Sequence, residues 1–264
     1  MKKDDLKILL HFAPFNTMWT VAKLVYKYAH KGVTAAKAAI FYIKWNVNDK
    51  KSLYKNLKDV KELKPFRPLR WKHQVCYFTG KVKGKRAFIK TGGEVNTTER
   101  EVYAIRYAGT HSEILKKHIP NVIFSNQDYL IEELVDGKVL NADDRYIEQL
   151  YEIYKEMKRC GILHLDIRPN NFIVKKDGTL ILIDFGYALV NTTNIYDRIE
   201  KTRVAKSIIK DVGSNYSPKN GTADDAYSML LTMKYICPSL LQKYPSIWKE
   251  LNEDIGEHSV NLEQ

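Results

Sequence analysis

The pattern of apolar and polar positions divides the chain into a helical beginning, a strand-rich middle and a mainly helical end. Up to about residue 64, alanines, aromatic residues and lysines recur at helical spacing, and Leu53, Leu57 and Val60 share one helical face. Pro65 closes this stretch. We therefore predict a basic amphipathic helical segment over residues 1–64, whose apolar face either packs on the rest of the protein or lies in a membrane interface.

From about residue 71 the spacing of apolar residues becomes the shorter one that is typical of β-strands. "HQVCYFTGKVKGKRAFIKTGG" predicts two strands joined by a turn at "KVKGK", with the second strand ending at Lys90. The next stretch predicts a helix that begins near Asn96 or Thr97, because both residue types cap helices and glutamates fill the first turn. "NVIFSNQDYLIEELVDGKVL" then predicts two short strands separated by the polar "SNQ".

The second half continues with a long helix and a hairpin. "DRYIEQLYEIYKEMKRCG" carries apolar residues at helical spacing and ends at Gly161. "FIVKK" and "LILID" read as two strands joined at "DG", a strong hairpin signal. From about residue 194 the pattern is mainly helical, so an α+β fold is expected.

Composition adds a charge bias and removes several classes of protein. The 264 residues are 44% hydrophobic and 28% charged, which indicates a folded globular chain, and the net charge of +12 favours an anionic partner or a solvated basic surface. Three widely spaced cysteines argue against a disulfide framework or a zinc site. We expect no secretory signal and no membrane span, and a cytoplasmic location.

Polar side chains interrupt the apolar strands at one place, "HLDIRPNN" at 164–171 and "DFG" at 184–186. Such groups cost free energy beside buried strands unless they are paired or used. The spacing H-x-D-x-x-x-x-N, then a hairpin, then D-F-G resembles the catalytic and metal-binding segments of the protein-kinase-like fold. The resemblance implies a bilobal domain over residues 65–264, with a small β-rich N-lobe at 65–133 and a mainly helical C-lobe at 134–264.

The resemblance also implies a role for each polar residue. Asp166 would orient an acceptor hydroxyl and accept its proton, and Arg168 would contact the transferring phosphate. Asn171 and Asp184 would hold Mg2+ through hard oxygen ligands. His164 would brace the loop and not act as a base.

The same likeness places the nucleotide. Lys90 would contact the phosphates of ATP and pair with Glu101, with Glu99 as the alternative glutamate in the same helix. The backbone of "YLIEELVDG" would receive the adenine, at Glu132, Glu133 and Leu134. Further on, Asp225 in "GTADDAYSMLLTM" would support the backbone around His164.

Three departures from the kinase pattern change the expected substrates. No glycine occurs between Gly32 and Gly80, so "RPLRWKHQ" or "TGKVKGK" would cover the phosphates, and a reversed nucleotide with nucleotidyl transfer stays open. Leu165 replaces the usual arginine, which argues against switching by activation-loop phosphorylation. No A-P-E phrase follows D-F-G, so the peptide cradle of ordinary protein kinases is missing or rebuilt.

The compact "NNFIVKKDGTLILID" resembles bacterial kinases that phosphorylate heptose or Kdo sugars of the lipopolysaccharide core. This likeness implies an ATP- and Mg2+-dependent kinase with an envelope sugar or glycolipid as acceptor, and peripheral contact of residues 1–64 with the inner face of an anionic membrane. The alternatives are a compact Ser/Thr protein kinase and a pseudokinase that binds a partner. The charge also permits nucleic acid, but no recognition motif accompanies it.

Overall fold

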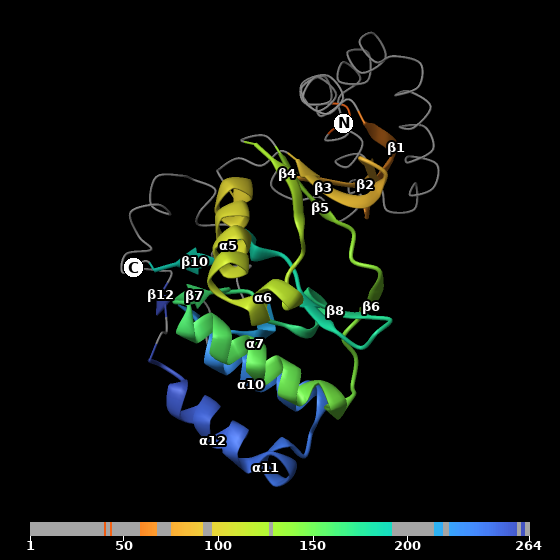
Figure 1. Ribbon diagram of the computed structural model, residues 1–264. Coiled ribbons are helices and arrows are strands. Elements are labelled where there is room, and N and C mark those ends of the chain that lie inside the picture. The colour runs from red at the N-terminus through yellow and green to blue at the C-terminus, as the bar shows by residue number, and fades with distance from the viewer. Residues whose placement is uncertain are drawn as a thin grey trace, which may run out of the picture. The chain divides into compact units, whose positions relative to one another are not determined.

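The computed structural model describes residues 40, 43, 59–67, 75–91, 97–126, 129–191, 214–218, 222–257 and 260–261. Contacts between residues divide the chain into two compact units. The first, residues 1–94 and 123–134, is called the sheet unit below, and the second, residues 95–122 and 135–264, the helical unit. Together they form a mixed α/β architecture with a β-rich region and a helix-rich region, consistent with a kinase-like fold (Figure 1).

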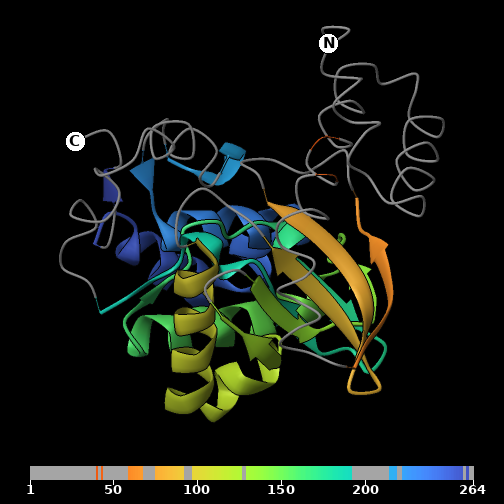
Figure 2. The same ribbon diagram turned by 90° about the horizontal axis from the view of Figure 1, so that it is seen from above.

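The sheet unit contains one antiparallel sheet in the order β1-β2-β3-β5-β4. Its strands are β1 (Val60–Pro65), β2 (Cys76–Val82), β3 (Lys85–Thr91), β4 (Val122–Ser125) and β5 (Tyr129–Glu133). Lys83 and Gly84, both with positive φ, make the tight turn between β2 and β3, as the sequence predicted. Figure 2 shows the orange and yellow strands of this sheet with the ordinary twist of β-sheets.

Alternate positions of β2 and β3 supply the core of the sheet unit. Phe78, Val82, Ala87 and Ile89 are completely buried and pack with Ile131 of β5. This period of two places the intervening side chains on the other face of the sheet. The sequence predicted these strands because apolar and polar residues alternate at the same period.

The predicted helical segment 1–64 is wrong at its end. Residues 60–65 form β1, which pairs antiparallel with β2, and a bulge lies where Glu62 adopts a φ of 56°. Lys81 Nζ donates to Glu62 Oε1 at 2.6 Å across this irregular pair. Backbone pairing with β2 therefore decides the conformation over the apolar spacing. Residues 40 and 43 are helical, and the remainder of 1–58 lies outside the described residues.

The helical unit contains six α-helices among its described residues. They are α5 (Thr97–His111), α6 (Glu113–His118), α7 (Ile147–Arg159), α10 (Asp225–Ile236), α11 (Leu240–Lys243) and α12 (Pro245–Asp254), of which α11 is a single turn. Short strands connect them: β6 (Gly137–Val139), β7 (Ile162–Leu163), β8 (Phe172–Lys175), β9 (Leu180–Leu182), β10 (Leu189–Val190), β11 (Thr222–Ala223) and β12 (Val260–Asn261).

The described part of the unit also has four short 3-10 turns: η3 (Asp144–Tyr146), η4 (Pro169–Asn171), η5 (Phe185–Tyr187) and η6 (Ser214–Tyr216). Strands β6, β8 and β9 form an antiparallel sheet, while β7 pairs with β10 and β11 with β12. The predicted hairpin is confirmed, with Gly178 at a φ of 84° in its turn. The predicted stop of α7 is confirmed too, because Gly161 takes a φ of 64° directly after it.

Helix α7 packs against α10, and α10 against α12 (Figure 1). Ile147, Leu150, Ile153 and Met157 form the buried stripe of α7. At the end of this stripe Asp254 of α12 accepts hydrogen bonds from Tyr154 Oη at 2.7 Å and Lys158 Nζ at 2.6 Å. The three helices therefore pack together as one group. Strand β7 and the loop after it follow α7 directly in the chain. None of the described helices is long and apolar enough to cross a bilayer.

Gly137 tests the close packing of the three-stranded sheet. A Cβ at this position would stand 2.2 Å from the Val174 carbonyl oxygen, which is backbone and cannot turn aside. We expect Gly137→Ala to lower the free energy of unfolding by about 1–3 kcal/mol. Gly109→Ala in α5 is the control, because its Cβ would make an ordinary 3.6 Å contact with Ile119 and alanine favours a helix. Thermal unfolding measures both, and equal midpoints would contradict the packing described.

Candidate functional site

Three of the polar residues singled out in the sequence meet in the loop between β7 and β8. Asn171 Nδ2 donates to both the carbonyl oxygen and Oδ2 of Asp166, each at 2.8 Å. An Arg168 Nη2 atom lies 2.9 Å from the same Oδ2, and Asp166 is only 1% exposed. Two donors on one oxygen fix the rotation of a buried carboxylate, so the loop presents Asp166 in a single orientation.

Asp225 at the start of α10 holds the backbone of this loop. Its Oδ2 accepts from the His164 amide at 2.5 Å and its Oδ1 from the Leu165 amide at 2.9 Å. Leu165 needs such support because it adopts a φ of 63°, a conformation that is unfavourable for a leucine. Burial raises the pKa of Asp225 to about 6, an effect that the two amide donors partly offset. The carboxyl is therefore mostly ionised at neutral pH.

His164 is a bracing residue, as the sequence suggested. It is fully buried, its Nδ1 accepts from the Asp166 amide at 3.3 Å, and its Nε2 lies 3.2 Å from the Ile183 carbonyl oxygen. Burial lowers the pKa of His164 to about 4. The ring is therefore neutral at pH 7 with its proton on Nε2, because only that tautomer satisfies both bonds. Its ring also meets Phe185 edge to face at 4.6 Å.

Asp184 follows β9 and is brought to the loop by the backbone. The Ile183 amide donates to the Asn171 carbonyl oxygen at 2.9 Å, so the residue before Asp184 is bonded to the residue that would share a metal with it. Asp184 adopts a φ of 67°, which turns the chain sharply into η5. A non-glycine residue held in this region is typical of functional sites.

The donor set suits Mg2+. Because Asn171 commits its amide nitrogen to Asp166, the amide oxygen is the atom left to face a cation. A carboxylate and an amide oxygen, completed by nucleotide phosphates and water, are how Mg2+ is usually held. No cluster of three or more His, Cys, Asp and Glu able to hold a metal exists among the described residues, so a cation here relies on such non-protein ligands.

Helix α5 distinguishes between the two candidate glutamates. Glu101 is 2% exposed, whereas Glu99 is exposed to solvent. Helix α5 packs against η5 and β10, the segment that follows Asp184. Glu101 is therefore the residue of the pair with an inward position, and it belongs to the helical unit.

The remaining nucleotide residues lie in the sheet unit. Lys90 of β3 is 6% exposed, pairs with Leu130 of β5, and has its Nζ 5.9 Å from the centre of the Tyr77 ring. Glu132 is buried and Glu133 is exposed on β5, and the Leu134 amide donates to the Arg86 carbonyl oxygen at 3.0 Å. The amide of Leu134 is thereby engaged, so this residue has only its carbonyl oxygen to offer an adenine.

Only one of the two segments proposed to cover the phosphates lies entirely among the described residues. "TGKVKGK" forms the end of β2, the two-residue turn and the start of β3, and its lysines are exposed. Residues 68–74 of "RPLRWKHQ" lie outside the described residues.

Asp224 is a supporting residue that the sequence reasoning missed. It caps α10 by accepting from the Tyr227 amide at 2.9 Å, and its other oxygen accepts from the Gly256 amide at 2.7 Å. It therefore fixes the helix end that carries Asp225. The two consecutive aspartates before an apolar helix were the available signal, since one of them had to be the cap.

His164 gives the site a pH dependence of known sign. The unfolded chain binds a proton at a pKa near 6.5, the folded chain only near 4, so stability falls as the pH drops through this window. His164→Asn removes that proton, and we expect the stability difference between wild type and variant to shrink by up to about 3 kcal/mol from pH 7 to pH 4. Asp225, whose raised pKa acts in the opposite direction, is common to both proteins. Urea unfolding across this range measures the effect, and a pH-independent difference would contradict the assignment.

Sequence comparisons agree with this geometry. A profile of the ABC1 atypical kinase-like domain matches residues 89–214, a range that begins beside Lys90 and includes the whole loop. CBL-interacting protein kinase 20 of Oryza sativa subsp. japonica is 27% identical over 208 residues, which are 68% of this chain and 43% of that protein. Probable serine/threonine-protein kinase PknB of Lactococcus lactis is 34% identical over 88 residues, 26% of this chain and 14% of that protein.

A third match, the putative ABC transporter A445L of Paramecium bursaria Chlorella virus 1, is 33% identical over 87 residues, or 31% of this chain and 19% of that protein. The chain thus spans less than half the length of these curated relatives. The matched domain, the kinase relatives and the loop around Asp166 together support membership of the protein-kinase-like superfamily.

Proposed function

We propose that the protein transfers the γ-phosphate of ATP to a hydroxyl group in a reaction that requires Mg2+. The observation that supports this best is the orientation of Asp166, whose carboxylate is buried and held by both Asn171 and Arg168. Phosphoryl transfer depends on positioning and charge neutralisation more than on covalent help from the protein. A rigidly held carboxylate with a cationic neighbour supplies both.

In this proposal Asp166 accepts a hydrogen bond from the acceptor hydroxyl and takes its proton as the oxygen attacks the γ-phosphorus. The bond between that phosphorus and the β,γ-bridging oxygen breaks, and ADP leaves with the electron pair. Arg168, whose side chain is 30% exposed, neutralises negative charge on the phosphoryl group. Neutral His164 takes no part in proton transfer and keeps the loop in place.

The cation would be held by Asn171 and Asp184. Mg2+ bound there supplies charge neutralisation to the nucleotide phosphates. Asn171 and Asp184 would contribute oxygen ligands. The backbone hydrogen bond from the Ile183 amide to the Asn171 carbonyl oxygen keeps their two segments together. Lys90 and Glu101, which belong to different units, keep the roles in nucleotide binding that the sequence resemblance implies.

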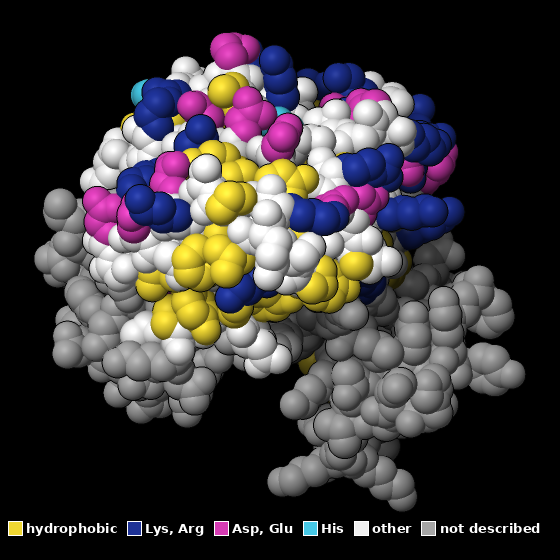
Figure 3. All heavy atoms as spheres, turned by 90° about the horizontal axis from the view of Figure 1, so that it is seen from below, with side chains coloured by type: hydrophobic (Ala, Val, Ile, Leu, Met, Phe, Trp, Pro, Cys, Tyr) yellow, Lys and Arg dark blue, Asp and Glu magenta, His cyan; other side chains and the backbone are white. Residues whose placement is uncertain are grey.

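For the acceptor we propose an envelope sugar or glycolipid, such as the heptose or Kdo of a lipopolysaccharide core, handled at the inner face of an anionic membrane. The net charge of +12 and the lack of an A-P-E phrase support this choice. Figure 3 shows apolar side chains gathered on the lower face, with both basic and acidic side chains around them. Tyr235 and Leu241 are each 47% exposed, and apolar surface of this kind favours contact with another surface.

A protein hydroxyl is the second candidate acceptor. The names of two relatives support it, since one is a protein kinase and the other a probable serine/threonine-protein kinase. The catalytic loop treats both acceptors alike, because each supplies an alcohol oxygen to Asp166. Incubation with ATP and Mg2+ together with either an envelope glycolipid extract or a delipidated lysate separates the two.

Asp166→Asn tests the proposed base. We expect it to lower the rate of phosphotransfer at least about 100-fold, because the amide cannot accept the proton. Nucleotide binding should persist, since the variant leaves Asn171 and Asp184 in place. Asp177→Asn, an exposed aspartate in the β8–β9 turn, is the control and should retain wild-type turnover. Wild-type turnover in Asp166→Asn would overturn the assignment.

Arg168→Lys tests the phosphate contact. A lysine keeps the charge but loses the planar fork that reaches Asp166 and a phosphate together. We expect a decrease in kcat of about tenfold with little change in the KM for ATP. An increase in KM alone would show that Arg168 serves ground-state binding instead.

A further inference from the structure

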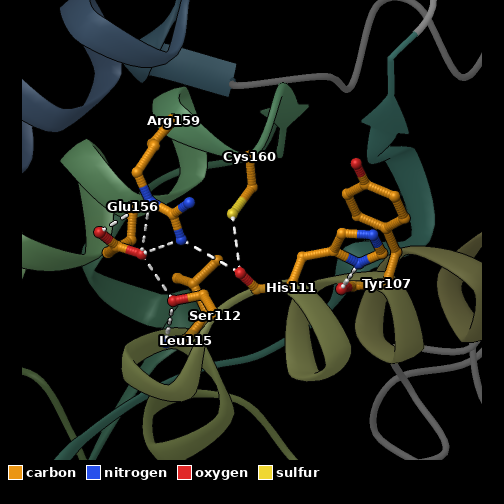
Figure 4. Close-up of polar contacts among 7 residues, drawn as sticks. All are labelled: Tyr107, His111, Ser112, Leu115, Glu156, Arg159 and Cys160. Carbon is orange, nitrogen blue, oxygen red and sulfur yellow. Dashed lines mark hydrogen bonds and ion pairs between the residues drawn. The ribbon is translucent and has the colours of Figure 1, made fainter.

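Helix α5 is fastened at its C-terminal end by contacts that the proposed chemistry does not use. Figure 4 shows the end of this helix, with Tyr107 and His111, beside α7, with Glu156 and Arg159. All of these residues belong to the helical unit, so their arrangement is independent of the sheet unit. The contacts fall into two groups, one toward α7 and one toward the strand that follows η5.

The first group joins α5 to α7 through a partly buried junction. Ser112 caps α6 by accepting from the Leu115 amide at 3.0 Å, and its hydroxyl donates to Glu156 Oε2 at 2.6 Å (Figure 4). Arg159 bonds the same carboxylate at 2.7 Å and donates to the His111 carbonyl oxygen at 3.1 Å. The Arg159 guanidinium is the main reason that the pKa of Glu156 is lowered, so the junction is ionic at neutral pH. These contacts hold the C-terminal end of α5 against α7.

The second group joins α5 to the end of β10. Asn191 Nδ2 donates to Tyr107 Oη at 2.6 Å, and the Asn191 amide donates to the Gly161 carbonyl oxygen at 2.9 Å. The ring of Tyr107 is held in place by stacking on His111, with ring centres 3.8 Å apart (Figure 4). Tyr107, Asn191 and Gly161 therefore form a three-part latch between a helix, a strand end and a turn.

The backbone is shaped for this latch. Asn191 adopts a φ of 46°, and Gly161 a φ of 64°. A Cβ at position 161 would stand only 2.3 Å from Asn191 Oδ1, so the turn accommodates the asparagine because residue 161 is glycine. Gly161 thus has a second role besides ending α7, and it is this close approach that places the Asn191 amide group against Tyr107.

The two ends of the latch lead to two residues of the proposed active site. Tyr107 lies six residues after Glu101 on the same helix, a rise of about 9 Å. Asn191 follows β10, which pairs with β7 and comes five residues after Asp184. A bond between Tyr107 and Asn191 therefore fixes the helix of Glu101 relative to the strand that follows Asp184.

We propose that Tyr107 and Asn191 are positioning residues that lock α5 to the end of β10 and thereby hold Glu101 in register with Asp184. In many switches an element shifts between two discrete positions, and this latch would keep α5 in one of them. The effect on catalysis rests on the function proposed above. The latch itself does not, and it can be measured without any turnover.

Tyr107→Phe removes the hydroxyl and keeps the ring stack. We expect amide hydrogen exchange to become at least about threefold faster at Asn191 and along residues 101–107 of α5. Tyr103→Phe is the matched control, since Tyr103 lies one turn earlier on α5, is 58% exposed, and should leave exchange unchanged. Asn191→Gly tests the bond from the other side, because glycine keeps the backbone conformation and removes the amide donor. If amide exchange in Tyr107→Phe and in Asn191→Gly is as slow as in the Tyr103→Phe control, the proposed latch is contradicted.

The catalytic part is tested by combining Tyr107→Phe with Glu101→Gln. We expect Tyr107→Phe alone to lower kcat/KM for ATP about threefold to tenfold, and to have no further effect when Glu101 is already replaced. Multiplying losses would show that Tyr107 acts on general stability and not through Glu101. If the wild-type protein transfers no phosphate while exchange still responds, the proposed function fails and the latch stands. If turnover is normal but exchange does not respond, the latch fails and the proposed function stands.

Discussion

The whole candidate site depends on one buried carboxylate, that of Asp225, which accepts hydrogen bonds from two consecutive backbone amides of the loop that carries Asp166. An ionised carboxylate in such a place costs free energy unless donors surround it, and the rise of its pKa to about 6 shows that the donors compensate only in part. The stabilised conformation at Leu165 is left-handed, which the loop would otherwise avoid. Asp225 thus offsets strain at the residue directly before Asp166.

Each further element of the site builds on that loop. The chain that leaves Leu165 presents Asp166 to Asn171 and Arg168, and Asn171 in turn accepts from the Ile183 amide. His164 ties the same two segments together from the inside. Support also reaches Asp225 from the far side, through Asp224 and the turn after α12. The C-terminal helices therefore support the loop of the proposed active site, although none of their side chains is proposed to touch a substrate.

The meeting of the polar residues in the loop after β7 could be predicted from the sequence, because it depends on residue types and spacing within a short stretch of chain. Asp166, Asn171 and Asp184 are separated by a hairpin whose turn and strands have clear signals, so their meeting follows from short-range structure. The end of the first segment could not be predicted this way. Residues 60–65 have apolar positions that fit a helix, and only pairing with β2, about 20 residues further on, makes them a strand.

Contacts between residues that are far apart in the sequence could not be predicted either. Nothing in the local pattern marks Tyr107 as a neighbour of Asn191, 84 positions away, or shows that the Leu134 amide is already bonded to Arg86. The sequence could say that Glu101 and Glu99 lie on one helix, but burial was needed to separate them. The acceptor proposal rests on composition and on the absence of an A-P-E motif. These features say less about the surface that binds an acceptor than residue spacing says about the structure of a loop.

The identity of the transferred group is the decisive measurement for the proposed kinase, because the sequence lacks a glycine-rich loop and nucleotidyl transfer is the competing chemistry. Purified protein would be incubated with Mg2+, envelope extract or delipidated lysate, and ATP labelled in parallel at the α- or the γ-phosphorus. Transfer of the terminal phosphate would leave the γ-label on the acceptor and the α-label in ADP, with no AMP. Transfer of the α-label with release of pyrophosphate would contradict it and would indicate a reversed nucleotide.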